Sequence, residues 1–246
     1  MLYNLFFSPT GGSKKVASII SDELDKNHID VDLLLPQKAL SLTSSDLALF
    51  TFPSFGGRCP SIALERIQNI YSRGTKAVLV AVFGNRAIDD TLLEMKNEIE
   101  KRGFQIVAAI EAVAEHSLMK IYGIGRPDEE DKLELIDFAK RIKAKKESTL
   151  PSLPGKFPYK VFPGSSIKPL TSDECIDCKL CIKQCPVNAI NENNPKLIDK
   201  DKCIGCLHCI SICPVKAKKL DSDQVQDIQK KLENSCKERK ENKLYI

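Results

Sequence analysis

Eight of the ten cysteines in this 246-residue chain are gathered in two short runs. The first run, CIDCKLCIKQCP, covers residues 175–186, and the second, CIGCLHCISICP, covers residues 203–214. A disulfide framework is typical of small secreted domains. Here the cysteines are clustered in tetrads, and the start of the chain does not resemble a secretory signal. The two runs therefore predict metal binding, which constrains the fold of the residues around them.

Both runs have the pattern C-x2-C-x2-C-x3-C-P, which is that of the bacterial two-cluster ferredoxins. In that pattern the first three cysteines of a run bind one four-iron cluster, and the fourth binds the other. Residues 171–221 resemble such a ferredoxin over the whole module. The resemblance implies two [4Fe–4S] clusters, one bound by Cys175, Cys178, Cys181 and Cys213, and the other by Cys203, Cys206, Cys209 and Cys185.

Two other interpretations of these cysteines are weaker. C-x2-C pairs also suit zinc, but zinc gives no reason for triplets completed by a thiol from the other run. Radical chemistry with S-adenosylmethionine would need a C-x3-C-x2-C triplet, and neither run contains one. His208 lies inside the second triplet, where we expect a plain spacer rather than a residue that tunes a reduction potential.

The first 147 residues alternate between apolar runs and segments with helical spacing. The apolar runs predict strands at residues 2–7, 29–35, 46–52, 76–83 and 104–113. Helices are predicted after the first run and at residues 60–73, 87–102 and 127–146. Continuously apolar strands are typical of a parallel sheet covered on both faces. The pattern predicts an α/β fold with a doubly wound, five-stranded parallel sheet, followed by a small α+β ferredoxin-like domain.

The loops at the carboxyl ends of such strands are where a doubly wound sheet binds its ligands. The first loop, SPTGGS at residues 8–13, offers backbone amides and hydroxyls to a phosphate at the start of a helix. It is neither a Walker A loop nor a G-x-G-x-x-G turn. It resembles the T/S-x-T-G-x-T/S phosphate loop of flavodoxins. Residues 1–145 resemble a flavodoxin as a whole, which implies FMN as the cofactor.

The flavodoxin resemblance implies contacts to FMN from several loops. The residues concerned are Ser8, Thr10, Gly11, Gly12, Ser13, Pro53, Ser54, Phe55, Gly56, Gly57, Phe83, Gly84, Asn85, Arg86 and His116. Phe55 would stack on the flavin ring, where flavodoxins usually have a tyrosine or a tryptophan. Arg58 and Arg86 would lie near the ring and stabilise an anionic reduced flavin. The alternatives are solvated loop arginines and, for His116, a structural hydrogen bond.

The remaining segments are the stretch between the two domains and the C-terminal end. Residues 148–170 contain five prolines, which predicts a stiffened linker that packs along the first domain. The last 25 residues predict a charged helix with an unstructured end and a solvated face. We expect Cys59 and Cys236 to be ordinary thiols. The predicted parts are a flavodoxin-like domain (1–147), a linker (148–170), a ferredoxin domain (171–221) and a charged helix or tail (222–246).

Composition narrows the possible partners. The formal charge is +4 and the isoelectric point about 8.4. Two clusters with their thiolates and a bound phosphate would bring the loaded protein close to neutrality, so we expect no nucleic-acid partner. No apolar run approaches the ~20 residues that span a bilayer, so we expect no membrane insertion. The sequence predicts a cytoplasmic protein whose partners are redox proteins.

The whole chain looks like a flavodoxin–ferredoxin fusion, a type known from anaerobic bacteria and archaea. FMN exchanges electrons singly or in pairs and each cluster carries one, so joining them in one chain raises their effective concentration. We expect an electron-transfer flavo-iron-sulfur protein rather than a dedicated enzyme. The alternatives are a flavin-dependent reductase of a small molecule fed by the clusters, or a docking protein whose flavodoxin domain is free of flavin.

Overall fold

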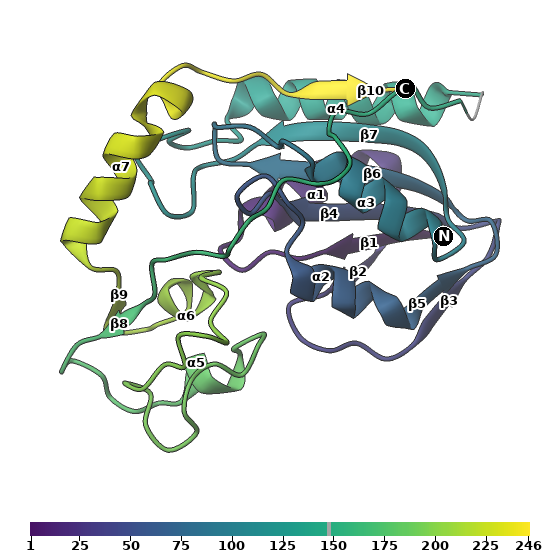
Figure 1. Cartoon of the computed structure of the whole chain (residues 1–246). Coiled ribbons are helices and arrows are strands. Elements are labelled where there is room, and N and C mark those ends of the chain that lie inside the picture. Colours follow the sequence, from purple (N-terminus) through teal and green to yellow (C-terminus); the bar gives the residue numbers. More distant parts are fainter. Residues whose placement is uncertain (147–148) are drawn as a thin grey trace.

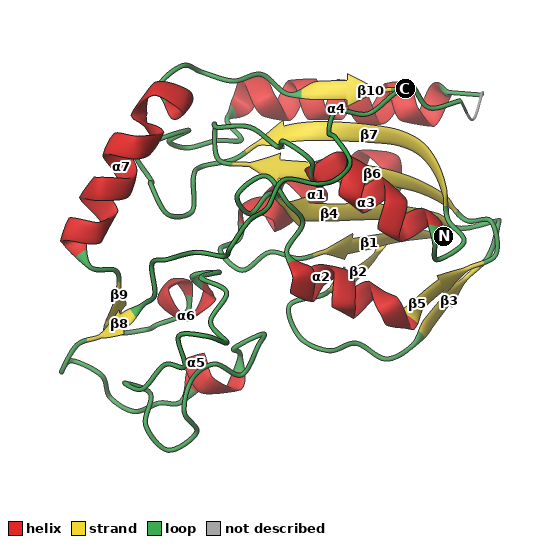
Figure 2. Cartoon of the chain, in the orientation of Figure 1, coloured by secondary structure: helices red, strands yellow, loops and turns green. Residues whose placement is uncertain are grey.

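The computed structural model describes residues 1–146 and 149–246, and its two halves are built differently. The N-terminal half is a sheet covered by helices (Figure 1). The cysteine-rich half consists mostly of loops (Figure 2). The predicted boundary between residues 147 and 148 lies outside the described residues. Among the described residues, no helix is both long and apolar enough to cross a membrane.

The main sheet has six strands, and its first five in the chain run parallel to one another. These five are β1 (Leu2–Phe6), β2 (Ile29–Asp32), β4 (Leu47–Pro53), β6 (Lys76–Phe83) and β7 (Gln105–Val113). Along the sheet they lie in the order β7-β6-β4-β1-β2. When these five are numbered among themselves, this is the 2-1-3-4-5 order of flavodoxin-like sheets. The predicted fold class is therefore confirmed.

Helices cover both faces of this sheet, as the continuously apolar strands predict. On one face, α1 (Gly12–Leu24) and α4 (Glu129–Ala144) lie side by side over buried residues such as Val80 and Ile110. On the other face, α2 (Ser61–Arg66) and α3 (Thr91–Glu100) cover a second apolar core. The sheet is buried on both sides, so its strand ends form a rigid rim.

Two expectations about the sheet domain are corrected. The segment expected to be helical over residues 60–73 is helical only to residue 69, after a 3-10 turn that follows α2. Its end forms β5 (Ile70–Ser72), which pairs in parallel with β3 (Leu40–Leu42) and buries Ile70. The second strand stops at Asp32 because it is an edge strand, paired on one side only.

In the cysteine-rich half, the repeated sequence forms the same local structure twice. Helices α5 (Leu180–Lys183) and α6 (His208–Ser211) each contain the third cysteine of a run. Each helix is preceded by a residue with a left-handed backbone, Lys179 at φ 59° and Leu207 at φ 63°. Strands β8 (Leu170–Thr171) and β9 (Lys218–Lys219) form an antiparallel pair that joins the two ends of the module.

The C-terminal segment returns to the sheet, so the expectation of an unstructured end is wrong. Helix α7 (Ser222–Cys236) packs the apolar stripe Val225, Ile228 and Leu232 against Met119 and its neighbours. That stripe recurs at helical spacing, so α7 has a buried face as well as a charged one. Strand β10 (Lys243–Tyr245) then pairs antiparallel with β7 at the edge of the main sheet.

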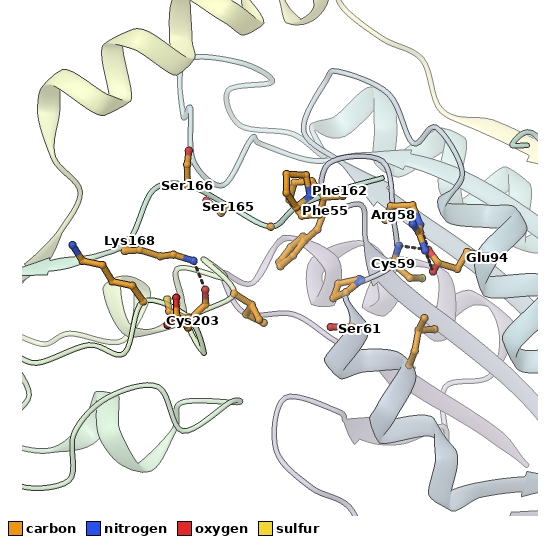
Figure 3. A pocket seen from close by; sticks show the side chains of 17 residues that line it. Phe55, Arg58, Cys59, Ser61, Glu94, Phe162, Ser165, Ser166, Lys168 and Cys203 are labelled. Carbon is orange, nitrogen blue, oxygen red and sulfur yellow. Dashed lines mark hydrogen bonds and ion pairs between the residues drawn. The ribbon is translucent and has the colours of Figure 1, made fainter. Parts of the chain in front are cut away.

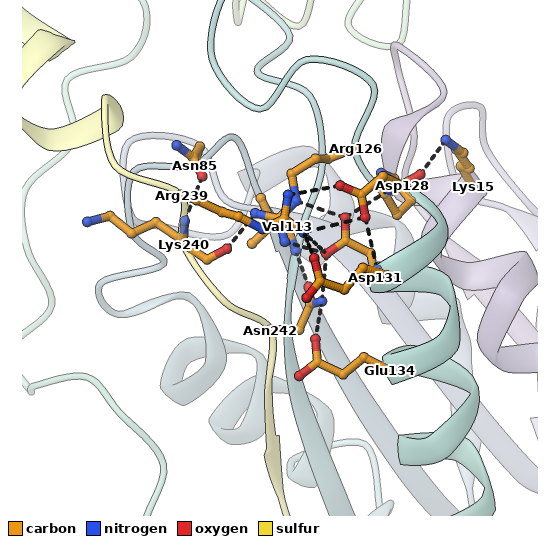
Figure 4. Close-up of polar contacts among 12 residues, drawn as sticks. Lys15, Asn85, Val113, Arg126, Asp128, Asp131, Glu134, Arg239, Lys240 and Asn242 are labelled. Atoms are coloured by element: carbon orange, nitrogen blue, oxygen red, sulfur yellow. Dashed lines mark hydrogen bonds and ion pairs between the residues drawn. The ribbon is translucent and has the colours of Figure 1, made fainter.

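Buried polar contacts hold this returning segment in place (Figure 4). The side chain of Asn85 donates to the carbonyls of Cys236 and Glu238 and accepts from the backbone N–H of Lys240. Asn242 accepts from the N–H of Val113 and donates to carboxylates on α4. The cysteine-rich half is thus attached to the sheet domain on both sides, through the linker and through α7 with β10.

Candidate functional site

Four cysteines from the two runs line one cavity. Cys175, Cys178 and Cys181 come from the first run and Cys213 from the second. The remaining wall is largely apolar and includes Leu180, Pro195 and Val215. This group, called the first set, is one of the two ligand groups that the sequence predicts. The structure therefore brings these four thiols together, with one of them supplied by the other run.

The other four cysteines, called the second set, are Cys203, Cys206, Cys209 and Cys185. Burial, with smaller contributions from the neighbouring Cys185 and Cys203, raises the pKa of the Cys206 thiol to about 12. Burial likewise raises the pKa of the Cys209 thiol to about 12. Cys185 therefore lies with the second run. Without a metal these buried thiols stay protonated at neutral pH and unreactive.

The described residues contain no group of three His, Cys, Asp or Glu side chains that could hold a metal ion. A zinc site needs such convergence on a single ion. An iron–sulfur cluster instead takes its thiolates at separate irons. The arrangement of the first set around a cavity fits an iron–sulfur cluster.

A further cavity lies at the carboxyl ends of the parallel strands, where the sequence predicts FMN. It is lined by Ser8, Thr10, Gly12, Ser13, Pro53, Ser54, Phe55, Phe83, Gly84 and His116, among others. A neighbouring cavity shares several of these walls and adds Gly56 and Arg86. We call the two together the strand-end cavity. Gly11, Gly57 and Asn85 lie outside it, and Asn85 is engaged by the C-terminal segment.

The loop between β1 and α1 is held in a tight turn by its own hydrogen bonds. The N–H of Lys14 donates to Ser8 Oγ at 2.8 Å, and the N–H of Lys15 donates to the carbonyl of Gly11 at 3.0 Å. Gly11 has φ 90°, a left-handed conformation that lets the chain turn into the helix. The loop presents small side chains and the start of α1 to the strand-end cavity, which suits a phosphate.

His116 is fixed at the other wall of this cavity. Its Nδ1 accepts from the N–H groups of Leu118 and Met119, at 3.2 and 3.1 Å. Nδ1 is therefore unprotonated, and a neutral ring carries its proton on Nε2. Burial, with a smaller contribution from Arg86, lowers the pKa of His116 to about 4. At neutral pH His116 is an uncharged hydrogen-bond donor.

Gly84 allows His116 to lie this close to the neighbouring loop. A Cβ at position 84 would come within 2.7 Å of both Cα and Cγ of His116. Real Cβ atoms do not make such contacts, so a larger residue would push the histidine from the wall of the cavity. Sequence resemblance predicts both residues as cofactor contacts, and the structure brings them together.

Comparisons with known proteins agree with this division of the chain. Residues 169–214 match the family described as 4Fe-4S dicluster domain. A curated ferredoxin from Rickettsia felis is 40% identical over 38 residues, which are 15% of this chain and 35% of that protein. The chain thus spans about a third of the length of the curated relative it matches.

Solved flavodoxins resemble the N-terminal part. Oxidised flavodoxin 1 from Bacillus cereus aligns with 57% of this chain and 95% of its own, at 15% identity and a TM-score of 0.41. A flavodoxin from Streptococcus pneumonia TIGR4 aligns with 58% of this chain and 97% of its own, at 17% identity and a TM-score of 0.40. The family match and the order of the strands, described above, decide what the two parts are. The chain joins a flavodoxin-like domain to a dicluster ferredoxin domain. Iron–sulfur clusters and flavins are both cofactors that carry electrons.

The ferredoxin domain contributes directly to the strand-end cavity of the flavodoxin-like domain. Cys206 of the second set lines it together with Ser8 and Thr10. Ile204, Gly205 and Leu207, which surround that cysteine, line the adjoining part. The sequence analysis missed this contact, because motif spacing carries no information about how two domains dock.

Two more segments cover the same cavity from outside the flavodoxin-like domain. The linker supplies Phe162, which packs so closely on Gly56 that a Cβ there would lie 2.3 Å from the ring. Helix α7 supplies Ile228 and Leu232. Two sequence signals could have indicated that these segments cover the cavity. They are the aromatic residues of the linker and the apolar stripe of α7.

His208 links the two domains and is not a plain spacer. It is buried, with Nδ1 2.7 Å from the carbonyl oxygen of Pro9 in the phosphate loop and Nε2 3.1 Å from Gln184 Oε1. Ser211 Oγ donates to the same carbonyl at 3.0 Å. The helix that carries Cys209 is thereby bonded to the loop predicted to hold phosphate.

The two arginines near the predicted ring site differ in position. Arg86 lines the strand-end cavity and pairs with Asp89 at 2.5 Å. Arg58 instead lines an adjoining cavity of about 680 Å³ between the domains, which shares Phe162 and Ile204 with the strand-end cavity. Arg58 also makes two hydrogen bonds to Glu94 (Figure 3). Phe55 lines both cavities. Arg58 therefore lies beside the strand-end cavity rather than in its wall, and its place near the flavin ring stays a prediction.

Proposed function

We propose that this protein passes electrons between two [4Fe–4S] clusters and FMN within one chain. The observation that carries the proposal is the position of Cys206. This cysteine belongs to the second set and lines the same cavity as the phosphate loop. A cluster bound by the second set would therefore adjoin a flavin bound at the strand ends, without any rearrangement of the domains.

The residues of the chain have separable roles in this proposal. Clusters supply one-electron transfer and FMN supplies one- or two-electron transfer. The first and second sets would each hold one cluster through four thiolates. The loop at residues 8–13 would hold the phosphate of FMN, with Phe55 against its ring. His116 would donate a hydrogen bond from Nε2.

The three segments that cover the strand-end cavity favour electron exchange between the flavin and a cluster of the same chain. Phe162, Leu207 and Leu232 come from the linker, the ferredoxin domain and α7, and together they line one side of the strand-end cavity. These apolar side chains exclude water and bulky molecules from that side. A flavin covered in this way would exchange electrons with the adjoining cluster rather than by collision with another protein.

The two sets occupy different positions in the path. Residues of the flavodoxin-like domain are absent from the wall of the first-set cavity, and Cys178 in that set is exposed to solvent. The second set adjoins the flavodoxin-like domain. We infer that a redox partner exchanges electrons with the first-set cluster, which exchanges them with the second-set cluster and so with FMN.

A flavin-dependent reductase of a small molecule is the second candidate. The cavity of about 680 Å³ favours it, because this cavity shares Phe55 with the strand-end cavity. Against it, Arg58 in that cavity is already bonded to Glu94. Tyr122, a tyrosine that could act with His116 in such a reductase, packs beneath α7.

The first test measures the cofactor content of the purified protein. Protein purified under argon is expected to contain about eight iron atoms, about eight sulfides and about one FMN per chain. Iron and sulfide without FMN would instead support a docking protein with a flavin-free domain. Steady-state turnover of candidate small molecules, faster than electron exchange with carrier proteins, would support the reductase.

Two cysteine variants then test the path. Cys206→Ala removes a ligand beside the strand-end cavity, and Cys178→Ala removes one at the exposed set. With a one-electron donor protein in stopped-flow experiments, both variants are expected to slow reduction of FMN. Cys59→Ala, which alters a buried thiol outside both sets, serves as the control. Reduction of FMN at the control rate in Cys206→Ala would contradict the proposed path.

A further inference from the structure

Lys218 is a buried lysine without an acidic partner. Its residue is 3% exposed, although lysine is rarely buried unless it is paired. Its Nζ donates to Thr171 Oγ1 at 2.7 Å and to the carbonyl of Pro195. Both acceptors are uncharged, and within residues 1–146 and 149–246 no carboxylate forms an ion pair with it. A buried cation in this state lacks its counter-charge.

Lys218 borders the first cysteine set, since it lines the cavity formed by Cys175, Cys178, Cys181 and Cys213. Burial raises the pKa of the Cys181 and Cys209 thiols, and the positive charge of Lys218 opposes that rise in each set. Beyond its two uncharged acceptors, the cation therefore lies beside thiols that would carry negative charge once a cluster is bound.

The internal repeat shows that the fold does not need a lysine here. The first run ends in CPVNAI and the second in CPVKAK, so Ile190 occupies the position that corresponds to Lys218. Both residues are buried, at 6% and 3% exposure, and both belong to short antiparallel pairings. One half of the module thus has an apolar side chain where the other half has a cation.

We propose that Lys218 is the buried counter-charge of the clusters and raises the reduction potentials of both, most strongly that of the first-set cluster. This inference rests on the proposed function, because it needs the clusters to be present. A cluster with four thiolates is negatively charged and gains one more negative charge on reduction. A fixed cation in a low-dielectric surrounding favours that reduced form.

The experiment measures the potential of each cluster by redox titration followed by electron paramagnetic resonance. The variants are Lys218→Met and Lys218→Gln, which remove the charge, and Lys218→Arg, which keeps it. Lys219→Gln removes an exposed charge one residue away and is the control. In the Met and Gln variants we expect the reduction equilibrium of the first-set cluster to shift at least tenfold towards oxidised, or about 59 mV for one electron. The second-set cluster should shift less.

The reciprocal variant sharpens the assignment. Ile190→Lys places a cation at the corresponding position of the other half and is expected to raise the potential of the second-set cluster. In Lys218→Arg and Lys219→Gln both potentials should stay close to those of the unmodified protein.

Each outcome decides the inference. Unchanged potentials in Lys218→Met and Lys218→Gln, with iron and sulfide at full content, would overturn it. Loss of iron from these two variants but not from Lys218→Arg would support the counter-charge role. Loss from all three would overturn it, since shape rather than charge would then matter. Absence of iron and sulfide from the unmodified protein would instead refute the proposed function, and this inference with it.

Discussion

The flavodoxin-like and ferredoxin domains are stabilised by different means. The flavodoxin-like domain has an apolar core on each face of its sheet, with fully buried residues such as Leu5, Phe50 and Leu79. In residues 171–221 the buried apolar residues are Ala189, Ile190, Leu207 and Ala217. So few apolar groups cannot offset the entropy of ordering the segment. The comparison teaches that the second fold depends on what its thiols bind, and the first does not.

Removing the metal should have the largest effect and should separate the two domains. Protein freed of iron by a chelator is expected to lose hydrogen-exchange protection throughout residues 171–221 and to keep it in β4, β6 and β7. Hydrogen exchange followed by mass spectrometry measures both regions in one sample. Continued protection of residues 171–221 in iron-free protein would show that this module has a core we have not recognised.

A core substitution should weaken the other domain. Leu79 lies fully buried in the middle of β6, and Leu79→Ala is expected to lower the free energy of unfolding of the sheet domain by about 2–5 kcal/mol. Iron content should remain unchanged. Leu133→Ala on α4, where the side chain is exposed, should change stability by less than about 0.5 kcal/mol. Equal effects of the two in urea titrations would contradict the assigned core.

The returning C-terminal segment connects the two domains, and Asn85 tests that connection. Asn85→Ala removes the three hydrogen bonds that its side chain makes to residues 236–240. The expected cost is about 2 kcal/mol, with faster hydrogen exchange in α7. Asn27→Ala, at an exposed position, is the matched control. If α7 exchanges equally slowly in both variants, the segment is held by its apolar face alone.

His116 should produce the smallest effect. Its folded-state pKa of about 4 lies below the ordinary value of 6.5, so the unfolded chain binds more protons between these values. Stability is therefore full above pH 6.5 and falls as the pH decreases towards 4. Urea titrations at pH 7 and pH 5 should show a loss about 1–2 kcal/mol larger in the unmodified protein than in His116→Gln. An imidazole that titrates near 6.5 by NMR would contradict the burial and hydrogen bonding described here.

Much of the architecture could be predicted because local patterns of the sequence determine it. The strand at residues 76–83 is continuously apolar and agrees with β6 at both ends. The repeated cysteine runs predicted the donor sets, and Cys213 does lie with Cys175, Cys178 and Cys181. In both cases residue type and spacing determine the result without reference to distant parts of the chain.

What could not be predicted depends on how distant segments meet. Asn85 lies in a loop that the resemblance assigned to FMN, but its amide is taken by a segment some 150 residues later. Helix α7 has an apolar stripe, yet its many charged residues favoured a solvated helix. The position of Cys206 beside the phosphate loop depends on how the two domains dock, and the cysteine pattern does not describe docking. The burial of Lys218 could not be predicted for the same reason, since it depends on how the module folds.

The linker and β10 both fasten the ferredoxin domain to one sheet, and this has a kinetic consequence. A domain on a single flexible tether must diffuse into a reactive orientation, so its rate falls as the solvent is thickened. A domain anchored on both sides keeps one orientation. Electron exchange between the second-set cluster and the flavin would therefore be first-order. Its rate constant would be the same at any protein concentration and insensitive to added glycerol or sucrose.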